Sequence, residues 1–117
     1  MTFSPVWKDE HTDLLAEAIL ALKDKEEVYR LLDDLCTVNE IKVMAQRIQI
    51  ARMLGWEKQF TYNEIAKTTG ASTATISRVK RCLNYGNGGY NTVLKRVLGE
   101  NDTAQDEKNG RGEAGSL

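Results

Sequence analysis

Apolar residues recur at helical spacing in two early segments of the chain. Leu15, Ala18, Ile19 and Leu22 form one stripe, and Val28, Leu31, Leu32 and Leu35 form a second. This i, i+3, i+4, i+7 spacing predicts two amphipathic helices whose apolar faces contribute to a core or to an interface. Ser4 followed by Pro5 predicts the start of the first helix, because Ser is a favoured N-cap and Pro a favoured first helical residue.

A third helix is predicted from Thr37 to about Leu54. Thr37 and Glu40 have the spacing of a capping box, in which each side chain accepts a hydrogen bond from the other residue's free backbone N–H. Gly55 is expected to end this helix. Its apolar residues occupy two faces, with Ile41, Met44, Ala45 and Ile48 on one and Val43, Ile50 and Leu54 on the other. A helix that is apolar on two faces needs two packing surfaces, so we expect the second surface to be another subunit.

Three shorter helices are predicted in the rest of the chain. Thr61 and Glu64 form a second capping box, which starts a helix that reaches about Thr68. After a tight turn, Ser72 caps a helix that reaches about Leu83, and a Gly-rich loop precedes the last amphipathic helix, residues 90–97. The following residues are almost all polar. The sequence therefore predicts an all-α domain over residues 1–99 and a disordered polar tail over residues 100–117.

The segment after the second capping box has the spacing of a helix-turn-helix. Ile65, Ile76 and Val79 are expected to face inward, and Ala66 is small where the second helix crosses the first. Gly70 allows the positive φ that the turn requires. This pattern is typical of a helix-turn-helix that contacts DNA, and the alternative is a helical hairpin that merely turns at Gly70.

The helix over residues 72–83 has an outward side suited to DNA. At about 100° per residue, its apolar residues cluster inward, whereas Ala74, Ser77, Arg78 and Arg81 lie outward with Thr75 and Lys80 at the flanks. Small residues let a helix enter the major groove, and cations reach the phosphates on either side of it. A merely solvated basic face is the alternative, but this face lacks the acidic i±4 partners that such a helix usually has.

The charges of the chain are segregated, although they nearly cancel over its 117 residues. Residues 1–36 carry four basic and nine acidic groups, residues 37–98 carry ten and three, and residues 99–117 carry two and five. The net charge is −1, but the middle segment is strongly basic. Because local fields attract ligands even where the net charge is small, the middle segment is the expected contact surface for DNA.

Several other classes of protein are disfavoured. The chain contains no run of about 18 apolar residues, and its first residues do not follow the pattern of a secretory signal, so we expect a cytoplasmic protein without a membrane span. His11, Cys36 and Cys82 do not have metal-ligand spacing. Because the chain also lacks a nucleophile elbow, a phosphate loop and paired carboxylates, we expect no enzymatic activity and no metal or cofactor.

The residue string Gly70-Ala71-Ser72-Thr73-Ala74-Thr75-Ile76-Ser77-Arg78, together with the segment 37–47, resembles the tryptophan repressor family. The likeness covers roughly residues 10–98 and is greatest to the Trp-repressor-like branch found in Gram-positive bacteria. It implies a six-helix fold, an intertwined homodimer and a helix-turn-helix. The family is a standard example of a helix-turn-helix whose second helix lies in the major groove, and of contacts to bases that are mediated by water.

The resemblance also implies roles for individual residues. Carried over by position, Thr73, Ala74 and Thr75 approach bases, whereas Ser77 and Arg78 hold phosphates; Lys80 and Arg81 join the phosphate contacts because of their charge and their place on the helix. The family's effector pocket corresponds to Thr37, Arg47, Arg78, Val79 and Cys82. Val79 replaces a Gly and Cys82 replaces a Ser that binds the ligand's amino group. The added bulk of Val79 and the weakly hydrogen-bonding thiol of Cys82 disfavour tryptophan as the ligand. We therefore expect either no effector or a smaller, amino-acid-like one.

The function predicted from these observations is a sequence-specific DNA-binding transcriptional regulator, and we expect a repressor. Its partners are expected to be double-stranded DNA with a palindromic operator and a second copy of the chain. The sequence leaves two alternatives open. One is a helical oligomerisation module without nucleic acid, and the other is a DNA-binding domain similar to that of replication initiators.

Overall fold

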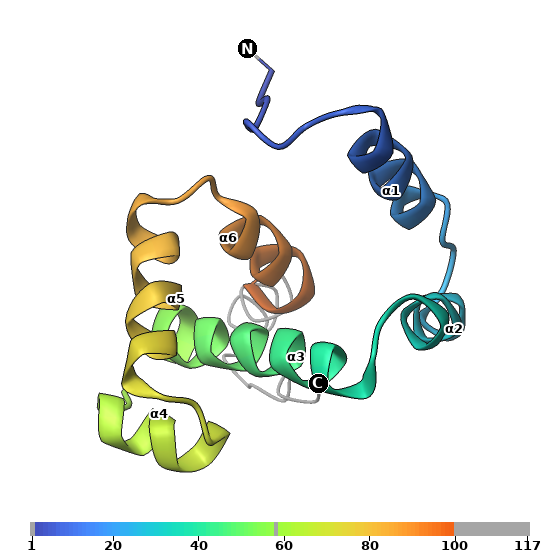
Figure 1. The fold of residues 1–117 in the computed structure, drawn as a ribbon. Helices are drawn as coiled ribbons and strands as arrows, with labels where there is room; N and C mark the ends of the chain where they lie inside the picture. Colours follow the sequence, from blue (N-terminus) through green and yellow to red (C-terminus); the bar gives the residue numbers. More distant parts are fainter. Residues whose placement is uncertain (1, 58, 100–117) are drawn as a thin grey trace, which may run out of the picture. The chain divides into compact units, whose positions relative to one another are not determined.

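The computed structural model describes residues 2–57 and 59–99, which form six α-helices and two π-helical turns without a β-strand (Figure 1). The elements are α1 (Glu10–Leu20), α2 (Lys25–Leu35), α3 (Val38–Arg52), η1 (Met53–Glu57), α4 (Tyr62–Thr69), α5 (Thr73–Tyr85), α6 (Gly89–Leu94) and η2 (Lys95–Gly99). The prediction of an all-α fold with six helices is confirmed. The tail predicted over residues 100–117 lies outside the described residues. None of the described helices combines the length and hydrophobicity needed to cross a bilayer.

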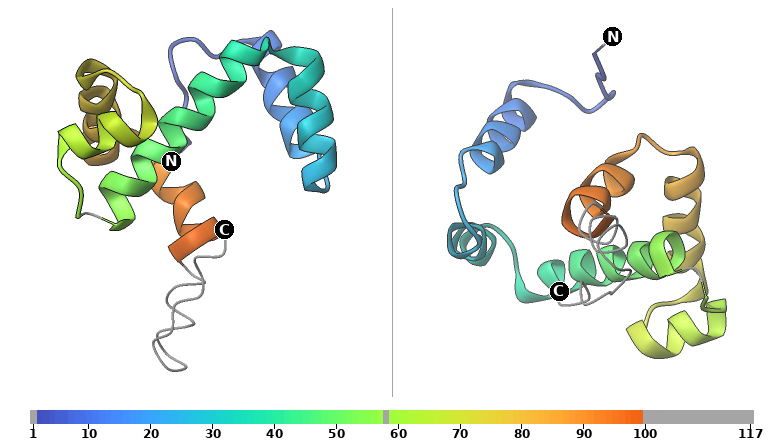
Figure 2. Two further views of the ribbon diagram at one scale, coloured as in Figure 1. Left: turned by 90° about the horizontal axis from the view of Figure 1, so that it is seen from below. Right: turned by 180° about the vertical axis from the view of Figure 1, so that it is seen from behind.

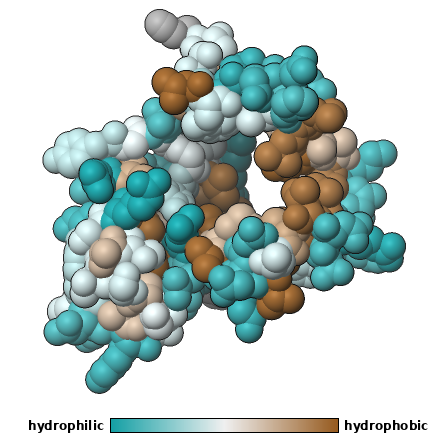
Figure 3. All heavy atoms as spheres, viewed as in Figure 1, coloured by the Kyte–Doolittle hydropathy of each residue, from teal (hydrophilic) through white to brown (hydrophobic). Residues whose placement is uncertain are grey.

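The chain divides into two compact units, and the boundary lies within α3, between Ile41 and Lys42. In the first unit, α1 and α2 contain no buried residue. Leu15, Ile19 and Leu35 from the predicted stripes are 43%, 53% and 55% exposed. Figure 3 shows hydrophobic side chains open on the surface over α1 and α2. Both apolar faces are therefore largely exposed in the part of the chain that the structure describes.

The first helix begins later than the sequence predicts. α1 starts at Glu10, and Asp9 is its N-cap. The Asp9 carboxylate accepts a hydrogen bond from the Thr12 N–H at 2.8 Å, and the Thr12 hydroxyl accepts one from the Asp9 N–H at 2.8 Å. The segment after Pro5 forms only a single turn, closed by the Lys8 N–H on the Pro5 carbonyl at 3.0 Å. The reciprocal cap at Asp9 satisfies two free donors, so the helix starts there.

The two predicted T-x-x-E capping boxes are confirmed. At Thr37 the backbone N–H donates to the Glu40 carboxylate at 2.8 Å, and the Glu40 N–H donates to the Thr37 hydroxyl at 3.1 Å. The pair Thr61 and Glu64 makes the same two bonds at the start of α4.

The end of α3 differs from the prediction. The α-helix stops at Arg52, and the π-helical turn η1 continues the chain past Gly55. A Cβ atom at Gly55 would lie 3.6 Å from the Leu83 Cδ2 atom. Gly55 therefore marks a close approach of α5 to this turn, and it does not end the helix.

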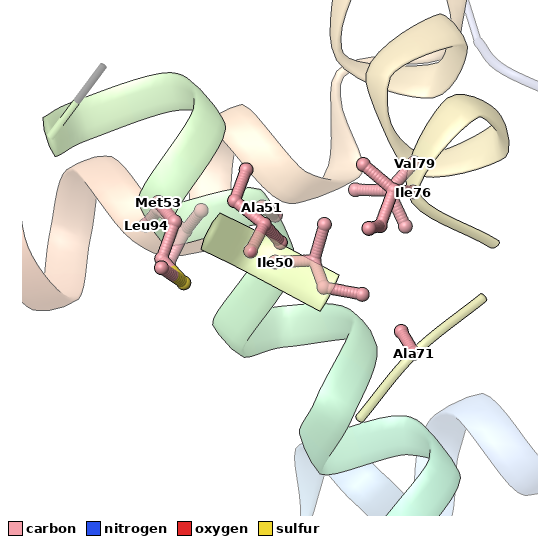
Figure 4. Packing of buried hydrophobic residues seen from close by; sticks show 8 residues of the cluster. Ile50, Ala51, Met53, Ala71, Ile76, Val79 and Leu94 are labelled. Atoms are coloured by element: carbon pink, nitrogen blue, oxygen red, sulfur yellow. The ribbon is translucent and has the colours of Figure 1, made fainter. Parts of the chain in front are cut away.

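The hydrophobic core lies in the second unit. Its buried residues are Ile50, Ala51, Met53, Ile65, Ala71, Ile76, Val79 and Leu94, which come from α3, η1, α4, the turn after α4, α5 and α6. Figure 4 labels the members that come from α3, η1, the turn after α4, α5 and α6. Burying branched side chains from α4 and α5 against α3 fixes the helix-turn-helix on the domain.

Candidate nucleic-acid interface

α4 and α5 form a helix-turn-helix and lie side by side in every view (Figures 1 and 2). Gly70 ends α4 in the left-handed conformation, with φ +77°, and its N–H donates to the Ala66 carbonyl at 2.8 Å. The predicted need for a glycine with positive φ is confirmed. The turn brings the start of α5 to the surface beside α4.

Thr69 holds this turn in place. Its hydroxyl donates to the Ile65 carbonyl at 2.8 Å and accepts from the Ala71 N–H at 3.1 Å. The side-chain amide of Gln46 in α3 donates to the Thr69 carbonyl at 2.9 Å, so α3 is tied directly to the turn. Gln46 could not be identified from the sequence, because only the packed fold brings it to a residue 23 positions away.

The N-terminus of α5 is fixed by Ser72, as predicted. The Ser72 hydroxyl accepts from the Thr75 N–H at 3.1 Å and donates to the Thr75 hydroxyl at 3.1 Å. Thr75 is half-buried, and it keeps its own hydroxyl hydrogen for an outside acceptor. The cap orients a polar side chain at the exposed start of the helix.

The two sides of α5 differ sharply in burial. Ile76 and Val79 are 0% and 1% exposed. The exposed side of the same helix carries the other predicted contact residues, Thr73, Ala74, Ser77, Arg78, Lys80 and Arg81. Among the described residues, no carboxylate forms an ion pair with any of the three cations of this helix. The structure thus places all seven predicted DNA-contact residues on one helix, with small side chains first and cations later.

Lys80 also contacts the first helix of the motif. Its Nζ atom lies 5.6 Å from the centre of the Tyr62 ring, at the start of α4. This is the distance of a cation–π contact. Lys80 therefore links the two helices of the motif across their exposed side.

The residues predicted for an effector pocket are distributed over both units. Thr37 belongs to the first unit, where it caps α3. Val79 is a core residue. Arg47, Arg78 and Cys82 share a neighbour in the second unit, the Tyr90 phenol. Burial raises the pKa of Tyr90 above its ordinary value of 10.0, Cys82 adds to that shift, and the two guanidinium groups oppose it.

A surface hollow of about 470 Å³ lies beside this group. Its lining residues are Ile48, Cys82, Gly86, Asn87, Gly89, Tyr90 and Val93. Cys82 is the predicted pocket residue that takes part in the lining. Ile48 and Tyr90 were expected only as members of amphipathic stripes, because the sequence does not show that α3 and α6 converge beside Cys82.

The fold defines a helix-turn-helix protein, and the exposed face of α5 is its candidate nucleic-acid interface. The family model named Trp repressor protein matches residues 10–98. This match spans most of the chain, so the chain belongs to the Trp repressor family, whose members are DNA-binding regulators.

Relatives of this chain come from Gram-positive bacteria. YerC of Bacillus subtilis (strain 168), described as uncharacterized, is 54% identical over 101 residues, which cover 86% of this chain and 94% of YerC. A TrpR-like protein from Eubacterium eligens ATCC 27750 has a solved structure with a TM-score of 0.71 and 51% identity, covering 77% of this chain and 91% of that chain. A second solved structure, from Staphylococcus aureus, has a TM-score of 0.70 and 49% sequence identity. The match covers 76% of this chain and 87% of that chain. The predicted kinship with the Gram-positive branch is confirmed.

Proposed function

We propose that this protein is a sequence-specific DNA-binding regulator that represses transcription in the cytoplasm. The observation that supports it most strongly is the exposed face of α5, which combines small residues at the capped start with three cations that no described carboxylate pairs. An oligomerisation module would have no use for such a face. The family match supports the same general class.

In the proposed complex, the N-terminal turn of α5 enters the major groove. Thr73, Ala74 and Thr75 then meet the base edges, where a hydroxyl can donate or accept and a methyl group can contact thymine. Ser77, Arg78, Lys80 and Arg81 lie further along the helix and reach the phosphates, which fix the position of the helix on the duplex. Gln46 and Thr69 hold the motif on α3, so they support its orientation.

The proposed assembly is a homodimer on a palindromic operator. Within one chain, α1 and α2 have no buried residue, and Met44 and Ile48 on α3 are 41% and 42% exposed. A second copy can cover these apolar faces and places two copies of α5 in successive major grooves.

We also propose that tryptophan does not control DNA binding. Val79 fills core space, and the thiol of Cys82 is a weak hydrogen-bond acceptor for an ammonium group. The protein then binds DNA without a corepressor, or it responds to a smaller amino-acid-like ligand through Arg47 and Arg78.

Selection of genomic fragments by the purified full chain tests the proposed function. We expect enrichment of a shared palindromic motif, with half-sites about one helical turn apart, upstream of genes. Enrichment confined to a replication origin would favour the initiator-like alternative. Absence of any enriched motif would contradict sequence-specific binding and favour the oligomerisation module.

A further inference from the structure

A second hollow, of about 490 Å³, opens within the second unit between η1, the start of α4, the later part of α5 and α6. Its lining residues are Leu54, Gly55, Phe60, Tyr62, Lys80, Leu83, Asn84 and Asn91. The described linings of this hollow and of the hollow beside Cys82 have no residue in common, and none of the predicted effector-pocket residues lines the second hollow. Its volume lies within the range of small-molecule sites.

The lining has an apolar part and a polar part. Leu54, Phe60 and Leu83 are half-buried and pack against the core, so they offer an apolar surface for a ring. Gly55 contributes only backbone atoms to the lining. A flat hydrocarbon group can therefore leave water against this surface.

The polar part of the lining offers N–H groups that can donate hydrogen bonds to a negatively charged group. Among the residues that the structure describes in this lining, Lys80 is the cation and none carries a carboxylate. The Lys80 amine lies 5.6 Å from the centre of the Tyr62 ring, a contact that leaves its three N–H donors free to bond to oxygen. The Asn91 amide spends one N–H on the Leu83 carbonyl at 3.3 Å and keeps a second. Asn84 is exposed at the same edge.

We propose that this hollow binds a small aromatic monocarboxylate. The ring lies against Leu54, Phe60 and Leu83, and the carboxylate accepts hydrogen bonds from Lys80 and the asparagine amides. Lys80 supplies a positive charge for the carboxylate, and a charge-assisted hydrogen bond makes the carboxylate preferable to a neutral group of the same shape. Binding requires neither DNA nor a corepressor at Cys82, so the proposal stands or falls separately from the proposed function.

The test uses the full chain without DNA and 3-phenylpropionate as the probe. Calorimetry should give saturable binding with a Kd of about 1 mM or tighter, the affinity expected for a ligand of this size. The neutral amide 3-phenylpropanamide and the cation 3-phenylpropylamine should each bind at least about tenfold more weakly. Amide NMR shifts should concentrate at Leu54, Lys80 and Leu83.

Two variants test the polar part of the lining. Lys80→Met keeps the length of the exposed side chain. It should weaken the binding of 3-phenylpropionate about tenfold and leave the binding of the amide probe unchanged. Lys67→Met removes another exposed cation, which lies at the end of α4 and outside the described lining of the hollow, and should leave the binding of both probes unchanged. Equal affinities for the three probes, no effect of Lys80→Met, no saturation, or shifts centred on Cys82 and Tyr90 would each overturn the proposal.

Discussion

Gly70 is the residue on which the turn of the helix-turn-helix depends. Its φ of +77° is unfavourable for a residue with a Cβ atom, although open space surrounds the position where that atom would lie. Gly70→Ala should therefore lower the free energy of unfolding by about 1–2 kcal/mol through backbone strain alone. Denaturant unfolding at fixed protein concentration measures this change.

Gly89→Ala provides the matched control for that experiment. Gly89 lies in α6, also faces open space, and does not have a positive φ. The alanine should leave the free energy of unfolding unchanged or raise it by up to about 1 kcal/mol, since alanine favours helix. Equal decreases at both positions would show that strain at Gly70 is not the reason.

Tyr90 gives the folded protein a dependence on alkaline pH. Burial disfavours the phenolate, so the pKa of Tyr90 in the folded state lies above the value of 10.0 that it has in the unfolded chain. Its contribution to stability is complete below pH 10.0 and is lost as the pH rises through the folded-state pKa. The free energy of unfolding of Tyr90→Phe should therefore decrease less at alkaline pH than that of the wild type.

The phenolate absorbance of the folded protein checks the same point. Tyr90 should ionise at a pH above its ordinary value of 10.0, and Tyr90→Phe should remove a high-pH step from the titration. If the titrations of the wild type and of Tyr90→Phe differed only by a tyrosine with the ordinary pKa of 10.0, the partial burial of the Tyr90 phenol would not raise its pKa as proposed.

At the scale of elements, α5 divides into a part that discriminates bases and a part that holds phosphates. Arg81→Ala should weaken binding to every duplex and reduce the slope of log K against log salt by about one. Thr73→Ala and Thr75→Ala should change the preferred sequence, because each removes a base-discriminating interaction that contributes about 1–3 kcal/mol. Anisotropy titrations over a series of salt concentrations and duplexes separate the two effects.

Lys23→Ala serves as the control for removal of a positive charge, because Lys23 is exposed and lies in the first unit. It should leave both the salt slope and the preferred sequence almost unchanged. If the Thr73 and Thr75 changes left the preference intact while Arg81→Ala altered it, the proposed docking of α5 would be wrong.

The elements were predictable where short sequence patterns determine them. Thr37–Glu40, Thr61–Glu64 and Ser72 fix helix starts through bonds between residues three apart, and each prediction is confirmed. Asp9 with Thr12 makes an equivalent cap, but this pair does not have the T-x-x-E form that marks the other two. The role of Gly55 depends on Leu83, which is distant in sequence, so its local pattern indicated a helix end instead.

The candidate site was predictable in part for the same reason. The spacing of Ile65, Gly70 and Ile76 determines the helix-turn-helix locally, and the exposed side of α5 follows from helical periodicity. The bond from Gln46 to Thr69 and the environment of Tyr90 arise only when α3, α5 and α6 pack together. Such long-range contacts leave no pattern in a single sequence.

At the scale of the whole molecule, we expect folding and dimerisation to be coupled. Sedimentation at micromolar concentration should give twice the 13.1 kDa chain mass, about 26 kDa. Ile19→Glu places a charge on the apolar stripe of α1 and should lower this mass or unfold the protein. Ala16→Glu introduces the same charge off that stripe and should not. A stable, folded wild-type monomer would contradict the proposed assembly.

The response to tryptophan is a second property of the whole molecule. Calorimetry should detect no binding at micromolar tryptophan, and gel shifts should not change with its concentration. Cys82→Ser is a better variant than Val79→Gly for testing whether the predicted effector pocket excludes tryptophan. Val79 is buried, so its replacement by glycine would leave a cavity in the core. Micromolar tryptophan binding that also tightens DNA binding would overturn the proposed independence from this ligand.

The most direct test of DNA recognition compares two duplexes that differ only in base order. Anisotropy titrations of the full chain at physiological salt would use the motif obtained from genomic selection and a shuffled duplex of the same composition. We expect the motif to bind at least about a thousandfold more tightly, with two chains per duplex. Equal affinities for the two duplexes would contradict the claim that α5 recognises DNA sequence.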